Sequence, residues 1–253
     1  MPHVYSVALP KGGSTKTTTA AELAARLAAA GHRTVAIDLD RQGNLTTRLG
    51  IGRDAAPNAV AAEVLTQAAT VDDAAMESPT VPGVWVVAGT SDLSEIEQQP
   101  DMVLALSVLM PTLTSWDAVV IDTPPAQGVL TLAALAAADQ VIASASVDAE
   151  SYDQLRELER LVNRVSQRLR PGQQIHWVVP TKYNRRRLLD REVLAEMTTR
   201  YDGRVTSPVR EAVAVRDAYV SGMPIGIYAP DSPVAQDYAD ALAPIVRATK
   251  ESD

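Results

Sequence analysis

Residues 10 to 19, PKGGSTKTTT, combine the residue types that a phosphate-binding loop requires. Gly12 and Gly13 can adopt positive φ and let the backbone close around an anion. Lys16 can reach the terminal phosphates of a nucleotide, and the Thr17 hydroxyl can coordinate Mg²⁺. The stretch therefore predicts a nucleotide site, with a Gly-rich turn and a polar helix cap as the alternative for these residues alone.

The same stretch departs from the common pattern G-x-x-x-x-G-K-[ST], which needs glycine where Pro10 and Thr15 stand. Thr15 is the more unusual of the two, because a β-branched residue fits positive φ poorly. We therefore expect the loop to be reshaped at Thr15.

Two further segments supply carboxylates at the ends of apolar runs. RTVAIDLDRQGN carries Asp38 and Asp40, and DAVVIDTPPA carries Asp122. Such acids can hold Mg²⁺, directly or through water, and can orient an attacking water. Aspartate is also a common turn residue after a strand, so each segment alone is weak. The three segments in this order indicate a metal-phosphate site.

Short β-branched runs must position these segments. They lie at residues 4–9, 33–38, 83–89, 117–122, 140–146 and 175–181, and helical patterns such as TTAAELAARLAAAG, VLALSVLMPTL, GVLTLAALAAA and SYDQLRELERLVNRVSQRL separate them. Apolar strands alternating with helices predict a mostly parallel α/β sheet with helices on both faces. Ligands bind such sheets at the carboxyl ends of the strands, where all three segments fall.

We expect one domain over residues 1–253, with no N-terminal DNA-binding extension because the first strand starts near residue 4. A further helix is predicted over residues 185–201. A last helix begins at Ser232, a plausible N-cap, with Pro233 in its first turn.

Composition excludes several classes of protein. The chain has no cysteine, so disulfides, thiolate metal sites and iron–sulfur clusters are excluded. It has no apolar run long enough to span a membrane and no leader pattern, so a cytoplasmic location is expected. The net charge of -8 argues against a surface that attracts nucleic acid everywhere, although a local basic patch is compatible with it.

Three motifs together resemble one known family. K-G-G-x-x-K-T-T, D-L-D-x-Q-G-N and I-D-T-P-P are similar to the deviant Walker A ATPases and, within these, to the ParA partition proteins. The resemblance extends, more loosely, over the C-terminal third. It implies a P-loop NTPase fold, ATP and Mg²⁺ as cofactors, an ATP-dependent homodimer, nonspecific DNA binding on the nucleoid and slow hydrolysis stimulated by a ParB-like centromere-binding partner.

The resemblance also implies roles for individual residues. Lys11 would reach across a dimer to the partner's ATP, Lys16 would be the P-loop lysine, and Asp40 would position the hydrolytic water. Arg41 stands where the family usually has proline, which bears on the hydrolysis rate. The resemblance further implies phosphate contacts from Gly12, Gly13, Ser14, Thr15, Thr17 and Thr18. It implies that the metal and its water shell are held by Thr17, Asp38 and Asp122. The adenine would be contacted by Thr181, Lys182 and the segment from Pro208 to Arg210.

For DNA, the resemblance implies arginines of the C-terminal third. Arg185, Arg186 and Arg187 would stand together at a helix start, where their charge opposes the helix dipole and a structural role is less natural. Arg216 would join this surface. Arg164, Arg168 and Arg170 are interpreted instead as a solvated helix face.

Sequence features distinguish the ParA proteins from some related ATPases. A MinD-like membrane ATPase needs a basic amphipathic C-terminal helix, whereas this chain has Pro244 within its last helical pattern and acids at its tip, so no membrane partner is expected. The nitrogenase iron protein branch needs cysteines. A ParA-like ATPase that positions a protein cargo, and a nucleotide-binding regulator with little turnover, remain open alternatives.

Overall fold

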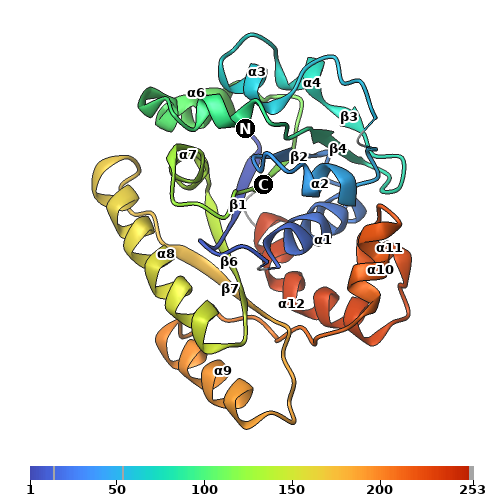
Figure 1. Cartoon of the computed structure of the whole chain (residues 1–253), viewed down its shortest axis with the longest axis vertical. Coiled ribbons are helices and arrows are strands. Elements are labelled where there is room, and N and C mark those ends of the chain that lie inside the picture. The colour runs from blue at the N-terminus through green and yellow to red at the C-terminus, as the bar shows by residue number, and fades with distance from the viewer. Residues whose placement is uncertain (14, 53, 251–253) are drawn as a thin grey trace.

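The computed structural model describes residues 1–13, 15–52 and 54–250. Its seven strands form one sheet in the order β3-β4-β2-β5-β1-β6-β7 (Figure 1). Neighbouring strands pair in parallel except β3, which runs antiparallel to β4 at the edge. The strands are β1 (His3–Ala8), β2 (Thr34–Asp38), β3 (Met76–Glu77), β4 (Val84–Val87), β5 (Ala118–Asp122), β6 (Gln140–Ser146) and β7 (Ile175–Thr181).

Helices cover both faces of the sheet (Figure 1), so the predicted fold class is confirmed. One face is covered by α1 (Lys16–Ala29), α2 (Asn44–Arg48), α10 (Ala214–Val220), α11 (Ile225–Tyr228) and α12 (Pro233–Lys250). The other is covered by α3 (Ala61–Leu65), α4 (Val71–Ala74), α5 (Leu93–Ile96), α6 (Ala105–Leu109), α7 (Val129–Ala137), α8 (Ala149–Arg168) and α9 (Leu188–Arg200).

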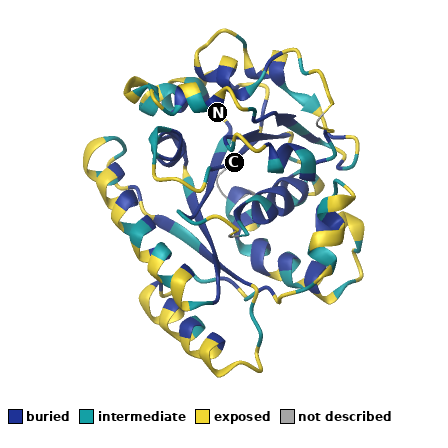
Figure 2. Cartoon of the chain, viewed as in Figure 1, coloured by how far each residue is buried: buried dark blue, intermediate teal, exposed yellow. Residues whose placement is uncertain are grey.

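The sheet is buried on both sides (Figure 2). In β2, Val35 and Ile37 belong to the core beneath α7 and α8, whereas Ala36 belongs to the core beneath α1 and α12. All three are at most 1% exposed. Burial on both faces explains why the strand sequences are apolar throughout rather than alternating with polar residues.

Small side chains let α1 lie close to the sheet. Ala20, Ala21 and Ala24 are fully buried, and α1 contacts β5, α2 and α12. The close approach fixes the start of α1, and with it Lys16, against the middle of the sheet, where β5 and β1 lie side by side. A helix that begins in the core presents its free N–H groups at one defined place at the sheet's edge.

Two sequence predictions need correction. VLALSVLMPTL is not one helix, since α6 is flanked by 3-10 segments at Pro100–Leu104 and Met110–Thr112, each with a proline that lacks the N–H needed to continue an α-helix. The helix predicted from residue 185 begins at Leu188, because Arg187 has extended backbone angles. Arg185 to Arg187 therefore lie in the loop that leads into α9.

Candidate nucleotide-binding site

The loop after β1 folds around the side chain of Lys16. The Lys16 ammonium donates to the Lys11 carbonyl at 2.9 Å, and the residue is only 5% exposed. Burial lowers the Lys16 pKa, while the charges of Asp122 and Asp40 oppose that shift. Gly13 has φ 68°, a conformation that favours glycine. The neighbouring Ser14 lies outside the described residues.

The backbone at Thr15 has a φ of −81°, which a β-branched residue adopts without strain. Thr15 therefore avoids the positive φ that glycine would permit at this position. The Thr15 hydroxyl shares hydrogen bonds with Ser144 Oγ at 2.9 Å and Thr181 Oγ1 at 2.5 Å. Ser144 also bonds Thr19 at 2.9 Å. A hydroxyl network thus ties the loop to β6 and β7.

Asp122 ends β5 as a fully buried carboxylate. Neither of its oxygens accepts a hydrogen bond from a described residue, and the nearby Thr17 hydroxyl lowers its pKa somewhat but falls short of hydrogen-bond geometry. Burial, followed by the charge of Asp38, raises the pKa of Asp122 to about 8. A buried carboxylate without donors is costly unless a cation or proton compensates it.

Asp38 lies beside Asp122 across the β2–β5 register. Its Oδ1 accepts from the Asp40 amide at 3.1 Å, and its Oδ2 accepts from the Thr46 amide and hydroxyl, both at 2.9 Å. Burial raises the pKa of Asp38 to about 6 despite these bonds. Through these hydrogen bonds, Asp38 holds both ends of the loop from Asp40 to Thr46 in place.

Asp40 is half-buried, and its Oδ1 accepts from the Gln42 amide at 3.0 Å. It lines a cavity of about 290 Å³ together with Lys16 and Thr17. The structure thus brings Asp40 next to Lys16 and Thr17 from another segment of the chain, in an arrangement suited to holding a phosphate and a water next to it.

The donor set fits a magnesium ion that is only partly held by protein. Among the described residues, no three acidic or imidazole side chains converge on one point. The free oxygens of Asp122 and the Thr17 hydroxyl are nevertheless hard oxygen ligands at the phosphate end of the site. Mg²⁺ usually binds through one or two protein oxygens, phosphates and water, which matches this sparse set.

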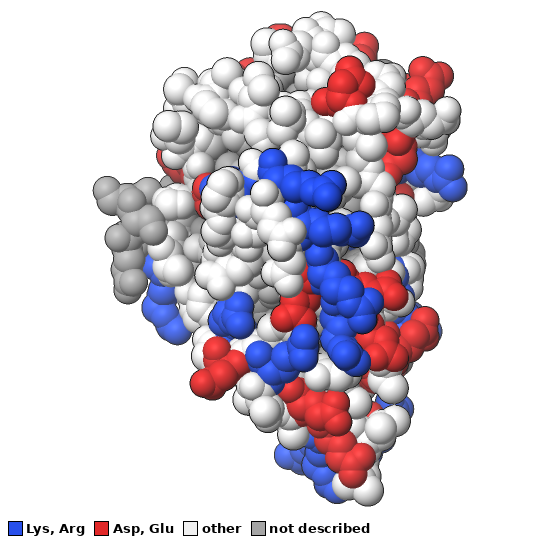
Figure 3. Space-filling view, turned by 90° about the vertical axis from the view of Figure 1, so that its left-hand side faces the viewer, with Lys and Arg blue, Asp and Glu red and all other residues white. Residues whose placement is uncertain are grey.

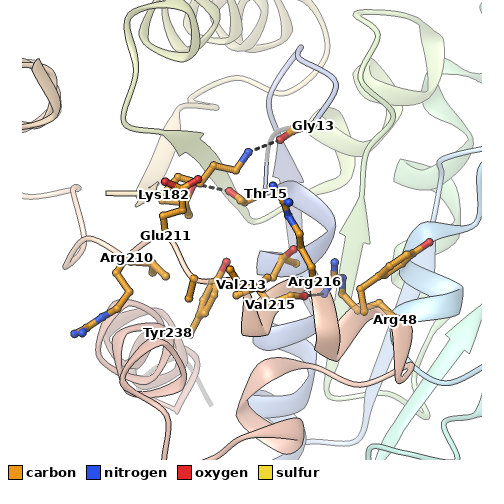
Figure 4. A pocket seen from close by; sticks show the side chains of 15 residues that line it. Gly13, Thr15, Arg48, Lys182, Arg210, Glu211, Val213, Val215, Arg216 and Tyr238 are labelled. Atoms are coloured by element: carbon orange, nitrogen blue, oxygen red, sulfur yellow. Dashed lines mark hydrogen bonds between the residues drawn. The ribbon is translucent and has the colours of Figure 1, made fainter. Parts of the chain in front are cut away.

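A larger cavity of about 560 Å³ opens on the other side of the loop (Figure 4). Thr15, Thr181 and Lys182 line it from the sheet side, and Arg216 from α10. Four residues line both cavities, which therefore meet there: Gly13, Thr18, Arg48 and Tyr219. The combined space has one end lined by Lys16 and Asp40 and another end with more apolar walls.

The residues assigned to adenine largely lie at this apolar end. Thr181, Lys182, Val209 and Arg210 line the larger cavity, whereas Pro208 is not among its lining residues. The Val209 amide donates to the Pro180 carbonyl at 2.8 Å, which holds this segment beside β7. Lys182 has φ 54° and its ammonium donates to the Gly13 carbonyl at 2.9 Å.

Lys11 lies apart from both cavities. Its ammonium is 3.1 Å from Glu150 Oε2 and 3.4 Å from Asp148 Oδ1, and it donates to Ser151 Oγ at 3.2 Å. These three residues form the start of α8, where Asp148 is the N-cap. In the single chain, the lysine is thus held by acidic partners at a helix end.

The residues assigned to DNA lie in two segments, and all four are exposed. Arg185, Arg186 and Arg187 are exposed in the loop before α9, and Arg187 pairs with Glu211 at 3.5 Å. Arg216 lines the larger cavity, with its side chain running toward the loop that holds Thr15 (Figure 4).

Sequence reasoning missed Arg48 and Tyr219 as residues of this site. A signal for Arg48 was available, since it stands between the buried residues Leu45 and Leu49, where an amphipathic helix would normally carry an apolar residue. Tyr219 carried no comparable signal, because its place at the site depends on how α10 folds back against α2.

Comparisons with known proteins define the class of this chain. A family model described as an AAA domain matches residues 3–175. The chain is 36% identical over 233 residues to the chromosome partitioning protein ParA of Caulobacter vibrioides, covering 89% of this chain and 86% of that protein. It is 31% identical to the sporulation initiation inhibitor protein Soj of Bacillus subtilis, covering 95% and 96% of the two chains.

Solved structures agree with the sequence comparisons. Cobyrinic acid a,c-diamide synthase of Mycobacterium smegmatis, with a bound ATP analog and magnesium, is 29% identical with a TM-score of 0.75, covering 88% of this chain and 91% of that one. McdA of Cyanothece shares the fold, with a TM-score of 0.84 at 21% identity over 98% and 99% of the chains.

The fold and the site define a P-loop ATPase of the MinD/ParA type. Within that class, the chain belongs to the ParA family of partition ATPases. The resemblance seen in the three sequence motifs is therefore confirmed. In addition, no helix among the described residues is long and apolar enough to cross a bilayer.

Proposed function

We propose that this chain binds ATP with Mg²⁺, dimerises on ATP, binds DNA without sequence preference and hydrolyses ATP slowly, with a ParB-like partner that accelerates the reaction. The observation that carries the proposal is Asp122, a buried carboxylate at the end of β5 that accepts no hydrogen bond from a described residue and lies near enough to the buried ammonium of Lys16 to act on its charge. A metal-bound phosphate would compensate both charges. The nucleotide-bound relatives support the same assignment of cofactors.

The residues of this chain have separable tasks in the proposed reaction. Lys16 and the loop amides hold the terminal phosphates and neutralise charge as it develops. Thr17 and Asp122 would hold Mg²⁺, which draws charge from the phosphate oxygens when bound. Asp40 orients the attacking water, and Asp38 fixes the loop that presents Asp40.

Dimerisation is assigned to Lys11. A positive charge that reaches phosphates only across a dimer makes ATP part of the subunit interface, and loss of the γ-phosphate then weakens that interface. The position of Lys11, exposed in part and outside both cavities of its own chain, is compatible with a role toward a partner subunit.

The DNA surface is assigned to exposed arginines. Arg185 and Arg186 make no side-chain ion pair with a described residue. A second group lies on α8, on the face that Figure 3 shows as a band of blue side chains running down the molecule. Its members stand four residues apart, are exposed and make no ion pair with a described residue: Arg156, Arg160, Arg164 and Arg168. The sequence favoured a solvated helix face for Arg164 and Arg168. We assign them to DNA here because an exposed row of unpaired positive charges suits a phosphate backbone.

Two variants test the central proposal. Lys16→Ala should abolish MgATP binding, because the loop loses its only buried ammonium toward the phosphates. Asp40→Ala should bind MgATP as the native chain does but lose hydrolysis. Binding is measured by calorimetry and hydrolysis by phosphate release. Native-like MgATP affinity of Lys16→Ala, or rapid hydrolysis by the purified native chain without a partner, would refute the proposal.

A further inference from the structure

Arg48 is a charged residue in an apolar position at the junction of the two cavities. It ends the short helix α2 and is 9% exposed. It makes no ion pair with a carboxylate among the described residues. Within the described part of the chain, it donates one hydrogen bond, to the Val215 carbonyl at 3.5 Å, and its Nε has no partner.

Such a guanidinium is poorly compensated. Removing a cation from water costs several kcal/mol unless an anion and further hydrogen bonds replace the water. Burial lowers the Arg48 pKa, which reflects this cost, and the nearest acids, Glu22 and Asp122, act on it only at a distance. The protein therefore retains a buried positive charge without a matching negative one.

Tyr219 holds this guanidinium at the cavity wall. The Arg48 guanidinium carbon lies 4.9 Å from the centre of the Tyr219 ring, and the Tyr219 hydroxyl donates to Asn44 Oδ1 at 3.0 Å. Both ends of α2 are thus fixed to α10. Stacking on an aromatic ring fixes the plane of an arginine while leaving its edge free to bind an anion.

We propose that Arg48 binds the nucleotide in its own subunit, through the phosphate next to the ribose, and that Tyr219 is its positioning residue. The inference rests on the proposed ATP-binding function. Arg48 lines the smaller cavity with Lys16 and Thr17 and also the larger one with Thr181 and Lys182. A nucleotide that spans both cavities places its innermost phosphate where they meet, beside Thr18 and Arg48.

The competing explanation is that Arg48 only ties α2 to α10. Arg26 provides a control, because its Nε also has no partner among the described residues and it also donates to a backbone carbonyl, that of Ala235 at 3.1 Å. It is half-buried, and the charge of Glu22 acts on it. Arg26 lines neither of the two cavities. A purely structural arginine should behave like Arg26.

The test measures the affinities of MgATP and MgADP for the native chain, Arg48→Gln, Arg48→Lys and Arg26→Gln by calorimetry, with the melting temperature of each nucleotide-free protein. Arg48→Gln should weaken both nucleotides by about tenfold or more and by the same factor, since a charge-assisted hydrogen bond is lost to a phosphate that both possess. Arg48→Lys should recover part of the loss. Arg26→Gln should lower the melting temperature but bind both nucleotides normally.

Affinities of Arg48→Gln within twofold of the native values would overturn the inference. So would a loss for MgATP that MgADP does not share, which would place the contact at the terminal phosphate, or an equal loss in Arg26→Gln, which would indicate general destabilisation. Failure of the native chain to bind MgATP would instead refute the proposed function. A Tyr219→Leu variant should show a smaller loss than Arg48→Gln, and unchanged affinity there would refute the positioning role.

Discussion

Lys11 lies 3.4 Å from Asp148, the N-cap residue of α8, and 3.1 Å from the neighbouring Glu150. The residue that the proposal assigns to the partner's ATP is therefore already paired within its own chain. Dimerisation must exchange these carboxylates for phosphate. The exchange is cheap, because ion pairs at a partly exposed site contribute about 0.2–1 kcal/mol.

Removing one of these carboxylates should favour the dimer. Glu150→Gln releases part of the hold on Lys11 without removing the helix cap, so ATP-dependent dimerisation should tighten by about two- to fivefold. Sedimentation at several protein concentrations measures this. Glu192→Gln, which removes an exposed carboxylate from α9, is the control.

Lys11→Ala provides the complementary variant. It should bind MgATP in the native range but fail to dimerise, because its charge contributes only across the interface. If Lys11→Ala dimerised as the native chain does, the assignment across the dimer would be wrong.

The hydroxyl of Thr15 should contribute to stability rather than to nucleotide affinity. Thr15→Val keeps the branched shape but removes the bonds to Ser144 and Thr181, which should lower the free energy of unfolding by about 1–3 kcal/mol. Thr15→Ser should restore most of this. Thermal denaturation checks both, and equal melting temperatures for Thr15→Val and the native chain would show that the network is dispensable.

Metal-nucleotide binding should depend on pH through Asp122. Its folded pKa of about 8 lies above that of an ordinary aspartate, so the carboxyl is largely protonated at pH 6. Mg²⁺ needs the carboxylate, and the affinity for MgATP should therefore rise by up to about tenfold per pH unit between pH 6 and 8. Asp122→Asn should bind MgATP weakly and show a flat profile.

The same raised pKa fixes the sign of the effect on stability. The folded chain holds this proton more tightly than the unfolded chain, so Asp122 stabilises the nucleotide-free fold at low pH and this contribution is lost as the pH rises from about 4 to 8. Asp122→Asn should accordingly be more stable than the native chain at pH 8, and by much less at pH 5. Chemical denaturation at both values decides this, and a pH-independent difference would contradict it.

DNA binding should depend on the exposed arginines in the loop before α9. Replacing Arg185, Arg186 and Arg187 by Gln should weaken ATP-dependent DNA binding, and the slope of log affinity against log salt should fall by about 0.9 per lost phosphate contact. Unchanged DNA binding would exclude this loop.

The four arginines of α8 provide the matched comparison. Their replacement by Gln, in a separate variant, tests the second row visible in Figure 3. Each protein is measured with ATP, ADP and no nucleotide, on DNA and on anionic liposomes. Liposome binding that matches DNA binding would favour a membrane function over the DNA function proposed.

Much of the fold was predictable because each element carries its own signal. The strands of residues 140–146 and 175–181 have the bounds expected from their apolar runs. The break in the region from Pro100 to Thr112 was missed, since its apolar spacing resembles a helix and the prolines decide otherwise. The short helices α2 and α10 were missed because tertiary packing, not periodicity, stabilises segments of that length.

The sequence alone determined the chemistry of this protein. The three motifs that contain Lys11, Lys16, Asp40 and Asp122 resemble the ParA family of P-loop ATPases. These residues fall at or just after the carboxyl ends of strands, where ligands collect in parallel sheets. Only the tertiary structure decided that Thr15 is unstrained and that Lys11 is paired with α8. It also decided that Arg216 and Arg48 face the nucleotide cavity. Those relationships join segments more than a hundred residues apart, and contacts of that kind are set by packing, which no local pattern of residues encodes.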